Sequence, residues 1–292
     1  MQAQLTIPEL LKFSIINLDK PSGPTSFGAD SIVMAMLRLN KVSHFGTLDP
    51  KVTGVLPIAL GRACKLTGFF IGHNKTYAGV MHFHEPIEQK VVEQAIKEHF
   101  IGIIKQTPPK KSSVKREERE REITSFDIIE QSEDKKDFVF ITEVQGGTYI
   151  RKLVHDLGLK LNITAHMAEL RRTKAGIFSE RDKEFCTLYD LEQAIKEYQQ
   201  GNEEKLRKIL IPAEQAIKKI LPIVISISDP IIEKNLLTGK KILKNWLKTD
   251  TIPDLQENDI FTIFTEQGKF IEIARRVTNE NDIFARPLFV YN

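Results

Sequence analysis

One short stretch, SHFGTLDPKVTGVLP at residues 43–57, gathers the residue types that acid, base or nucleophilic chemistry needs. Asp49 supplies a carboxylate, and Gly46 lets the backbone of the same loop approach a ligand closely. His44 and Thr47 bring hydrogen-bonding groups to that loop. A carboxylate held in this way can act as an acid, a base or a nucleophile, although an Asp-Pro pair is also a common way to open a turn.

Any reaction at Asp49 has to use a single carboxylate. A second Asp or Glu at short spacing is missing, which argues against a paired-acid hydrolase. The sequence also lacks a serine-nucleophile elbow, a P-loop and a dinucleotide-binding glycine motif. Its two cysteines, Cys64 and Cys186, form no metal-ligand spacing and no disulfide framework, so a reducing compartment is expected.

An ionised aspartate in a pocket needs a cationic partner. Burial raises the pKa of a carboxyl group by as much as about 3–5, whereas one close arginine lowers it by about 1–3. Arg151 in GGTYIRKLVHDLG is the candidate, because a Gly-Gly turn followed by Tyr-Ile-Arg aims a long bidentate donor from the first turn of a predicted helix. A surface ion pair with a nearby acid is an equally open interpretation of Arg151.

Aromatic and basic residues add features of a nucleic-acid surface. Tyr77 in KTYAG either fills the core or stacks on a base, and His44 either donates a hydrogen bond or fills space. Lys and Arg position a nucleic-acid strand through its phosphates, although each basic cluster is also typical of a solvated surface. The basic clusters are Lys110, Lys111, Lys115 and Arg116 in the charged segment 105–122, and Arg171, Arg172 and Lys174 in ELRRTKAG.

The elements that must position these residues alternate between strands and helices, which indicates an α+β fold. Thr25 or Ser26 is the expected N-cap of a helix that follows the KPSGPTS turn. We expect strands at 15–18, 54–61, 75–83, 123–130 and 137–145, and helices at 27–39, 90–100, 148–162 and within 187–219. From residue 221 onward short β-like pieces separated by Gly, Asn and Asp turns predict a small β-rich domain.

Length and charge set the organisation. A chain of 292 residues is long for one compact domain, so we expect a catalytic domain at 11–220 and a smaller domain at 221–292, with residues 1–10 packing on the latter. The net charge of +3 is too small to prove a polyanionic partner by itself. No apolar run reaches the length of a membrane span, so a soluble, intracellular protein without membrane association is expected.

Five ordered blocks of the sequence resemble the TruB family of RNA pseudouridine synthases, over residues 14–178. The details of KVTGVLP, PPKKSSVKR and AHMAELRRTKAG are most similar to its archaeal and eukaryotic dyskerin-like branch. The resemblance implies a pseudouridine synthase fold, with a mixed, largely antiparallel sheet flanked by helices and loops. The segment from Leu221 resembles a PUA domain, a small β-rich RNA-binding module. The blocks are INLDKPSGPTS, HFGTLDPKVTGVLPIALGRACKL, KTYAGVMHF, GGTYIRKLVHDLG and AHMAELRRTKAG.

The resemblance assigns roles to three catalytic residues. Asp49 matches the essential aspartate, implied to detach uracil from ribose either by attacking the sugar or by removing a proton from it. Tyr77 matches the aromatic residue that stacks on the target uracil and relays its proton, and Arg151 matches the arginine that pairs with the catalytic carboxylate. Phe45 stands where the family commonly has a small residue.

Further residues are expected to bind or surround the substrate. Leu170 matches an apolar wall of the uracil pocket, His44 lies beside the flipped nucleotide, and Lys20 with Pro21 buttresses the catalytic loop. The complete set of expected substrate-binding residues is Lys20, His44, Lys65, Lys152, Leu170, Arg171 and Arg172.

The function that the resemblance implies is guide-directed modification of ribosomal RNA by the catalytic subunit of an H/ACA ribonucleoprotein. Its partners would be target RNA, an H/ACA guide RNA and the core proteins, and no cofactor or metal is expected because the product is an isomer of the substrate. The alternatives are a stand-alone enzyme for uridine 55 of transfer RNA, an enzyme with both activities, and a catalytically silent RNA-binding scaffold. The location would be cytoplasmic in an archaeon and nucleolar in a eukaryote.

Overall fold

The computed structural model describes residues 5–108, 115, 117–278 and 282–292, so Lys110, Lys111 and Arg116 of the predicted basic cluster lie outside the described residues. The chain forms two compact units, Met1–Ile211 and Pro212–Asn292, here called the first and the second unit. Among the described residues, no helix combines the length and apolar character that crossing a membrane requires.

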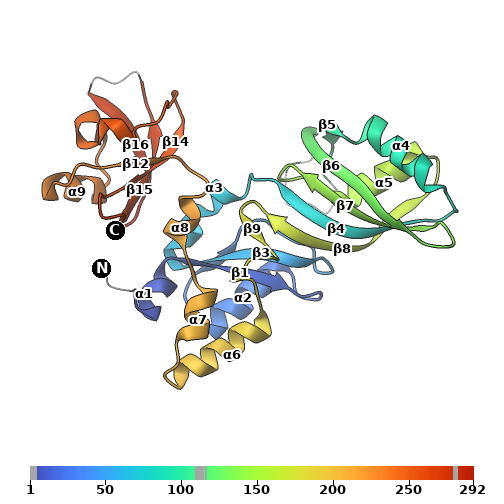
Figure 1. Ribbon diagram of the computed structural model, residues 1–292, viewed down its shortest axis with the longest axis horizontal. Coiled ribbons are helices and arrows are strands. Elements are labelled where there is room, and N and C mark those ends of the chain that lie inside the picture. The colour runs from blue at the N-terminus through green and yellow to red at the C-terminus, as the bar shows by residue number, and fades with distance from the viewer. Residues whose placement is uncertain (1–4, 109–114, 116, 279–281) are drawn as a thin grey trace. The chain divides into compact units, whose positions relative to one another are not determined.

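The first unit is built on a mixed, largely antiparallel sheet with the strand order β10-β1-β3-β8-β4-β7-β6-β5, as the resemblance predicts (Figure 1). Short strands extend it, among them β2 beside β3 and β9 beside β8. Parallel pairing joins β1 to β10 and β3 to β8. The strands are β1 (Ser14–Lys20), β2 (Val42–His44), β3 (Thr53–Leu60), β4 (Lys75–Phe83), β5 (Gly102–Gln106), β6 (Arg119–Gln131), β7 (Asp137–Val144), β8 (Ala165–Ala175), β9 (Phe178–Ser179), β10 (Cys186–Thr187) and β11 (Ile211–Pro212).

Helices flank this sheet: α4 packs on β6, α5 on β8, α2 on β2 and α6 on β1, and α7 packs against α6 (Figure 1). Their buried faces join one core with the strands. The predicted cap of α2 is confirmed, because the Thr25 side chain accepts a hydrogen bond from Gly28 N at 2.9 Å. The helices are α1 (Ile7–Lys12), α2 (Ser26–Met36), η1 (Gly61–Leu66), α3 (Thr67–Phe70), α4 (Gln89–His99), α5 (Ile150–Lys160), α6 (Leu188–Gln199) and α7 (Glu204–Ile209).

Strand β8 shows tertiary context overriding local preference. Its sequence, AHMAELRRTKA, is rich in residues that favour helices, and pattern alone gives it no clear assignment. In the fold it hydrogen-bonds to β4 along most of its length and to β3 at Arg171 and Arg172. A strand flanked on both sides satisfies its backbone groups in the sheet, and this outweighs the small helical propensity of each residue.

The second unit is small and β-rich, as the short β-like pieces and turn residues of the sequence predict. Its sheet has the order β12-β14-β15-β16-β13, and its core contains Val224, Phe261, Ile271 and Phe284. Its elements are α8 (Ala213–Ile217), β12 (Ile223–Ile225), α9 (Pro230–Leu237), β13 (Ile242–Leu243), η2 (Lys244–Trp246), η3 (Thr249–Thr251), β14 (Ile260–Phe264), β15 (Phe270–Arg276) and β16 (Ile283–Val290).

Candidate active site

Asp49 lies in the loop between β2 and β3, here called the catalytic loop (residues 45–52). Two glycines make the path of this loop possible. Gly46 has φ +104°, a conformation that side-chain-bearing residues rarely adopt. Gly54, with φ +98°, lets β3 approach β8 so closely that a Cβ there would lie 2.2 Å from the Arg172 carbonyl oxygen. The sequence places both glycines where only glycine fits.

Two buried side chains, Ser26 and Lys20, hold the backbone of the catalytic loop from the interior. Ser26 Oγ donates to the Leu48 carbonyl oxygen at 2.9 Å and accepts from Leu48 N at 2.7 Å. Lys20 Nζ donates to the carbonyl oxygens of Pro21, Pro24 and Pro50 at 2.8, 2.8 and 3.0 Å. Burial lowers the pKa of Lys20, while the nearby Asp49 carboxylate acts in the opposite direction. The backbone on both sides of Asp49 is thereby fixed.

Arg172 is the third buried residue that fixes the catalytic loop, and Lys20, Ser26 and Arg172 are here called the frame of this loop. Its guanidinium is buried and donates from Nε to the Val55 carbonyl oxygen at 2.8 Å and from a terminal nitrogen to that of Gly46 at 2.9 Å. Lys75 lies nearby with its ammonium on the carbonyl oxygens of Ile71 and His73, and burial together with the Arg172 charge lowers its pKa to about 8. Both interior cations thus satisfy backbone carbonyl oxygens through hydrogen bonds.

The sequence predicts RNA contacts for Lys20 and Arg172, and the geometry gives both a different task. Each is fully buried, and each directs its donors to backbone carbonyl oxygens of the catalytic loop or its neighbours. A cation that reaches a phosphate has to be accessible from solvent. For Lys20, the position agrees with the buttressing role that the resemblance also implies.

Arg151 occupies the first turn of α5, as its sequence context predicts. The entry to α5 is anchored by the buried Gln106, whose side chain accepts a hydrogen bond from Tyr149 N at 3.0 Å and donates one to the Tyr149 carbonyl oxygen at 3.3 Å. Gly147, with φ +89°, provides the turn before the helix. The start of α5 is therefore fixed by side-chain contacts from β5.

Asp49 and Arg151 form an ion pair, with one terminal nitrogen of Arg151 2.7 Å from a carboxylate oxygen of Asp49. Their side chains are 47% and 58% exposed, so solvent reaches both partners. Exposed pairs contribute only about 0–1 kcal/mol to folding. The pair is thus poorly explained by stability and well suited to orienting an accessible, negatively charged oxygen.

Tyr77 and Leu170 lie on the sheet face that carries Arg172. Tyr77 on β4 pairs with Arg172 on β8, which pairs in turn with Gly54 on β3, so the three residues stand at one level of the sheet. Directly opposed residues share a face, as do residues two apart on one strand. Leu170 crosses over Gly79, where a Cβ would lie 3.0 Å from its Cδ1. Tyr77 itself is 8% exposed.

His44 is tied to α2 and to the catalytic loop. One ring nitrogen, Nδ1, lies 2.7 Å from an Asp30 carboxylate oxygen, and the other, Nε2, lies 3.0 Å from Thr47 Oγ1. Asp30 is buried, so this contact holds the imidazole from the interior side. This arrangement fixes the ring orientation of His44 between α2 and the catalytic loop.

Phe45, the departure from the usual small residue, fills an aromatic cluster. Its ring stacks on Phe70 with centroids 4.6 Å apart and planes 1° apart, and Phe178 packs against both rings. The extra volume is buried in the core below the catalytic loop.

The remaining predicted substrate contacts lie at or near the surface. Arg171 makes a bidentate pair with Asp19 at 2.9 and 3.0 Å and also binds Glu180, and these partners raise its pKa. Lys152 pairs with Asp156 one helical turn later on α5, at 2.8 Å. Lys65 is exposed and lines a separate, largely apolar cavity of about 560 Å³. Lys115, of the charged segment, pairs with Glu117.

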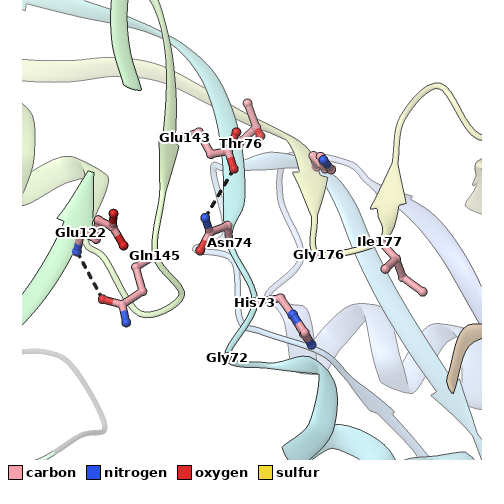
Figure 2. A pocket seen from close by; sticks show the side chains of 10 residues that line it. Gly72, His73, Asn74, Thr76, Glu122, Glu143, Gln145, Gly176 and Ile177 are labelled. Carbon is pink, nitrogen blue, oxygen red and sulfur yellow. Dashed lines mark hydrogen bonds between the residues drawn. The ribbon is translucent and has the colours of Figure 1, made fainter. Parts of the chain in front are cut away.

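A polar cavity of about 450 Å³ lies beside β4, β7 and β8 (Figure 2). Thr76, Glu143 and Lys174 line it and pair across β4, β7 and β8. Thr76 precedes Tyr77, and consecutive strand residues point to opposite faces. The Thr76 side chain in this cavity therefore lies on the face of β4 opposite to that of Tyr77.

Sequence reasoning missed three residues that build the site: Ser26 as a loop anchor, Asp30 as the partner of His44, and Gln106 as the anchor of α5. Each acts across 14 to 43 residues of chain. Asp30 offered one signal, since it is an acid within the otherwise apolar stretch FGADSIVMAM. Gln106 offered none, because a glutamine beside a charged segment is typical of a surface.

Comparisons with protein families agree on one class of enzyme. The family model for the N-terminal domain of TruB family pseudouridylate synthases matches residues 34–96. That for the C-terminal domain of tRNA pseudouridylate synthase B matches residues 151–218. The C-terminal model of Pus10 matches residues 71–176.

Similar curated proteins cover nearly the whole chain. A probable tRNA pseudouridine synthase B of Nanoarchaeum equitans is 38% identical over 96% of this chain and 78% of its own length. A protein of the same name from Methanopyrus kandleri is 39% identical over 92% of this chain and 77% of its own length. One from Methanococcus maripaludis is 40% identical over 96% and 88%.

Solved structures give the same result for the fold. A chain in a crystal structure of a Cbf5-Nop10-Gar1 complex matches with a TM-score of 0.87 and 32% identity, over 98% of this chain and 87% of that chain. A chain of an H/ACA ribonucleoprotein bound to a substrate RNA containing 2′-deoxyuridine matches with a TM-score of 0.86 and 30% identity, over 99% and 88%.

Proposed function

Because this chain belongs to the TruB family of RNA pseudouridine synthases, in its dyskerin-like branch, we propose that Asp49 is the catalytic residue with which it isomerises uridine in RNA. The observation that carries the proposal is the accessible Asp49–Arg151 pair at 2.7 Å. Tyr77 lies on the same sheet face as Arg172, and Arg172 donates a hydrogen bond to Gly46 of the loop that carries Asp49. The chain is an enzyme, an RNA pseudouridine synthase.

The reaction breaks the bond between N1 of uracil and C1′ of ribose and makes a bond between C5 and C1′. A proton leaves C5 and one is added at N1, so substrate and product are isomers. We assign Asp49 to the sugar, as nucleophile or as base, and Arg151 to holding and orienting its carboxylate. RNA covering the site would exclude water and strengthen this pair.

Tyr77 and Leu170 are proposed to enclose the extruded base. Taking a base out of its stack costs a few kcal/mol, and stacking on an aromatic ring returns about 1–3 kcal/mol. Tyr77 offers its ring from a rigid central strand. Lys20, Ser26 and Arg172 act as positioning residues, since they hold the loop and have no access to RNA.

The proposed setting is an H/ACA ribonucleoprotein that modifies ribosomal RNA. The supporting observation is the likeness, above 30% identity and over nearly the whole chain, to chains solved with Nop10 and Gar1. Target RNA, a guide RNA and such core proteins would then be its partners. We further infer that the second unit is a PUA-like module for the guide RNA, and that the enzyme is cytoplasmic, as its archaeal relatives favour.

The test of the catalytic assignment is Asp49→Asn. We expect pseudouridine formation to fall by at least roughly 10⁴-fold, as removing a nucleophile typically does, with RNA affinity nearly unchanged. Asp127→Asn, at an exposed aspartate on β6, is the matched control and should keep full activity. Substantial pseudouridine formation by the Asp49 variant would end the proposal.

A second candidate is stand-alone modification of transfer RNA, which the names of the curated relatives favour. Purified chain is incubated with unmodified transfer RNA, without guide RNA or partner proteins, and pseudouridine is mapped at nucleotide resolution. Product at uridine 55 establishes the stand-alone activity. Product only in ribosomal RNA after adding guide RNA and core proteins establishes the guided one, and product in both assays establishes both.

A further inference from the structure

Phe27 is the most exposed large hydrophobic side chain in the described part of the chain, at 75%. The other phenylalanines are buried or partly buried. A single exposed apolar residue on a protein surface is ordinary and needs no special explanation. The position of Phe27, rather than its exposure alone, carries the inference.

Phe27 is linked to the loop that carries Asp49 through a short connection. Ser26 and Leu48 are joined by two hydrogen bonds, Phe27 follows Ser26, and Asp49 follows Leu48. Each step along the chain spans about 3.8 Å between Cα atoms. The backbone beside Phe27 is thus anchored at the point that also fixes the backbone beside Asp49.

The neighbours of Phe27 on α2 also belong to the site. Asp30 is three residues further along, and residues three apart share one face of a helix. Asp30 holds His44, which in turn contacts Thr47 of the catalytic loop. Thr25 caps the helix before Phe27, and Ser31 Oγ donates to the Phe27 carbonyl oxygen at 3.0 Å. The backbone that presents the ring is therefore fixed.

We propose that Phe27 is a stacking platform for the base of a nucleotide next to the target uridine. This deepens the proposed function and rests on it. Tyr77 is nearly buried and suits a base that has entered the pocket, whereas Phe27 offers an open ring face to a base that stays in the strand. Every base has a π-face, so such a platform tolerates sequence and suits an enzyme whose target is chosen by base pairing.

The platform would also help to extrude the target base. A uridine that leaves its stack abandons its neighbour, which loses a stacking partner. The ring of Phe27 replaces that partner at low entropic cost, because phenylalanine has only two side-chain torsions to immobilise. The effect then appears in RNA binding rather than in the chemical step.

The test compares Phe27→Ala, Phe27→Leu and Phe27→Trp in the full chain, assembled with whichever RNA and partner proteins support wild-type activity. We expect Ala and Leu to weaken RNA affinity about 5- to 150-fold, which corresponds to roughly 1–3 kcal/mol at 1.4 kcal/mol per tenfold. Trp should keep near wild-type affinity. The rate at saturating RNA should stay unchanged in all three variants.

The matched control is Tyr189→Ala, since Tyr189 is an aromatic residue on α6 that is 67% exposed and should leave affinity unchanged. A direct readout is 2-aminopurine placed 5′ or 3′ of the target, whose fluorescence should be quenched on binding by wild type and Trp but not by Ala or Leu.

Three outcomes overturn the proposal: unchanged affinity in Phe27→Ala, wild-type affinity in Phe27→Leu, or a fall confined to the rate at saturating RNA. The second would identify an apolar protein contact, and the third a role in shaping the catalytic loop. Failure of the proposed function has a separate signature, namely activity in Asp49→Asn whatever Phe27 does.

Discussion

The buried polar groups beneath the catalytic loop and one buried glutamate of the second unit differ in how their hydrogen-bonding groups are satisfied. Beneath the catalytic loop, Lys20, Ser26 and Arg172 are all buried, and each makes at least two hydrogen bonds to backbone groups. On β15 of the second unit, Glu272 is also fully buried, yet neither of its carboxylate oxygens has a hydrogen-bond partner among the described residues. Burial raises the pKa of Glu272 to about 8.

The difference separates interior polarity that positions a site from interior polarity that costs stability. A satisfied buried network fixes a loop in one conformation, while an unsatisfied charge destabilises the fold unless it is neutralised. In the first unit, the hydrogen bonds of Lys20, Ser26 and Arg172 hold the loop that carries Asp49 in a defined position. Among the described residues Glu272 has no corresponding contact, so binding a proton, which removes its buried charge, lowers the cost of its burial.

The strongest challenge to this comparison is Arg172→Met. The substitution preserves much of the side-chain volume but leaves the carbonyl oxygens of Gly46 and Val55 buried without donors. At about 1–3 kcal/mol for each buried group left unpaired, we expect the first unit to lose roughly 2–6 kcal/mol. Pseudouridine formation should fall because the catalytic loop is no longer fixed. Chemical denaturation and activity assays measure the two effects.

A matched variant keeps that prediction specific to the loop. Arg181 is an exposed arginine of the same unit, and Arg181→Met should change neither stability nor rate. An Arg172→Met enzyme with wild-type stability and activity would show that the frame is dispensable, and the contrast with Glu272 would disappear.

Glu272→Gln probes the other side of the comparison through pH. The folded-state pKa of about 8 lies above the ordinary value of 4.5, so the folded protein binds the extra proton between these limits. The free energy of unfolding therefore falls as pH rises from about 4.5 to about 8 and is constant above that. Glutamine cannot ionise, so the variant should gain on the order of a few kcal/mol above pH 8, and nothing near pH 4.

Trp246 provides the measurement, because it is the chain's single tryptophan and lies in the second unit. Its fluorescence during denaturation at pH 4, 6 and 8.5 reports the unfolding of that unit. A wild-type protein whose stability in this assay is flat from pH 5 to pH 8 would contradict an unpaired Glu272. Glu257→Gln, at an exposed glutamate of the same unit, is the control and should leave the profile unchanged.

The sequence was sufficient for local features and insufficient for contacts across the sheet. The Thr25 cap, the turn glycines and the helical position of Arg151 follow from rules that act over a few residues, and the structure has all of them. The pairing of Asp49 with Arg151 follows from a requirement of charge, because an ionised carboxylate in a pocket needs a cation.

The sequence does not predict that Ser26 and Arg172 hold the catalytic loop, and the reason is physical. Whether Arg172 faces solvent or the interior depends on β8 lying between β3 and β4, which no local pattern in AHMAELRRTKA predicts. Its neighbour Arg171, on the other face of the strand, is accessible and paired with Asp19. Two adjacent arginines of identical chemistry thus receive different tasks from the alternation of a strand.

The smallest expected effect on stability is that of Lys152→Ala, which tests whether a surface cation belongs to the RNA site. Its i,i+4 pair with Asp156 is worth about 0.3–0.5 kcal/mol at most, so the thermal midpoint should barely move. If Lys152 contacts a phosphate, the slope of log affinity against log salt should become shallower by about 1. Lys196, paired with Glu192 on α6, offers an equivalent i,i+4 pair as control, and Lys196→Ala should leave the slope unchanged. An unchanged slope in Lys152→Ala removes this lysine from the site and leaves its pair as a feature of the helix alone.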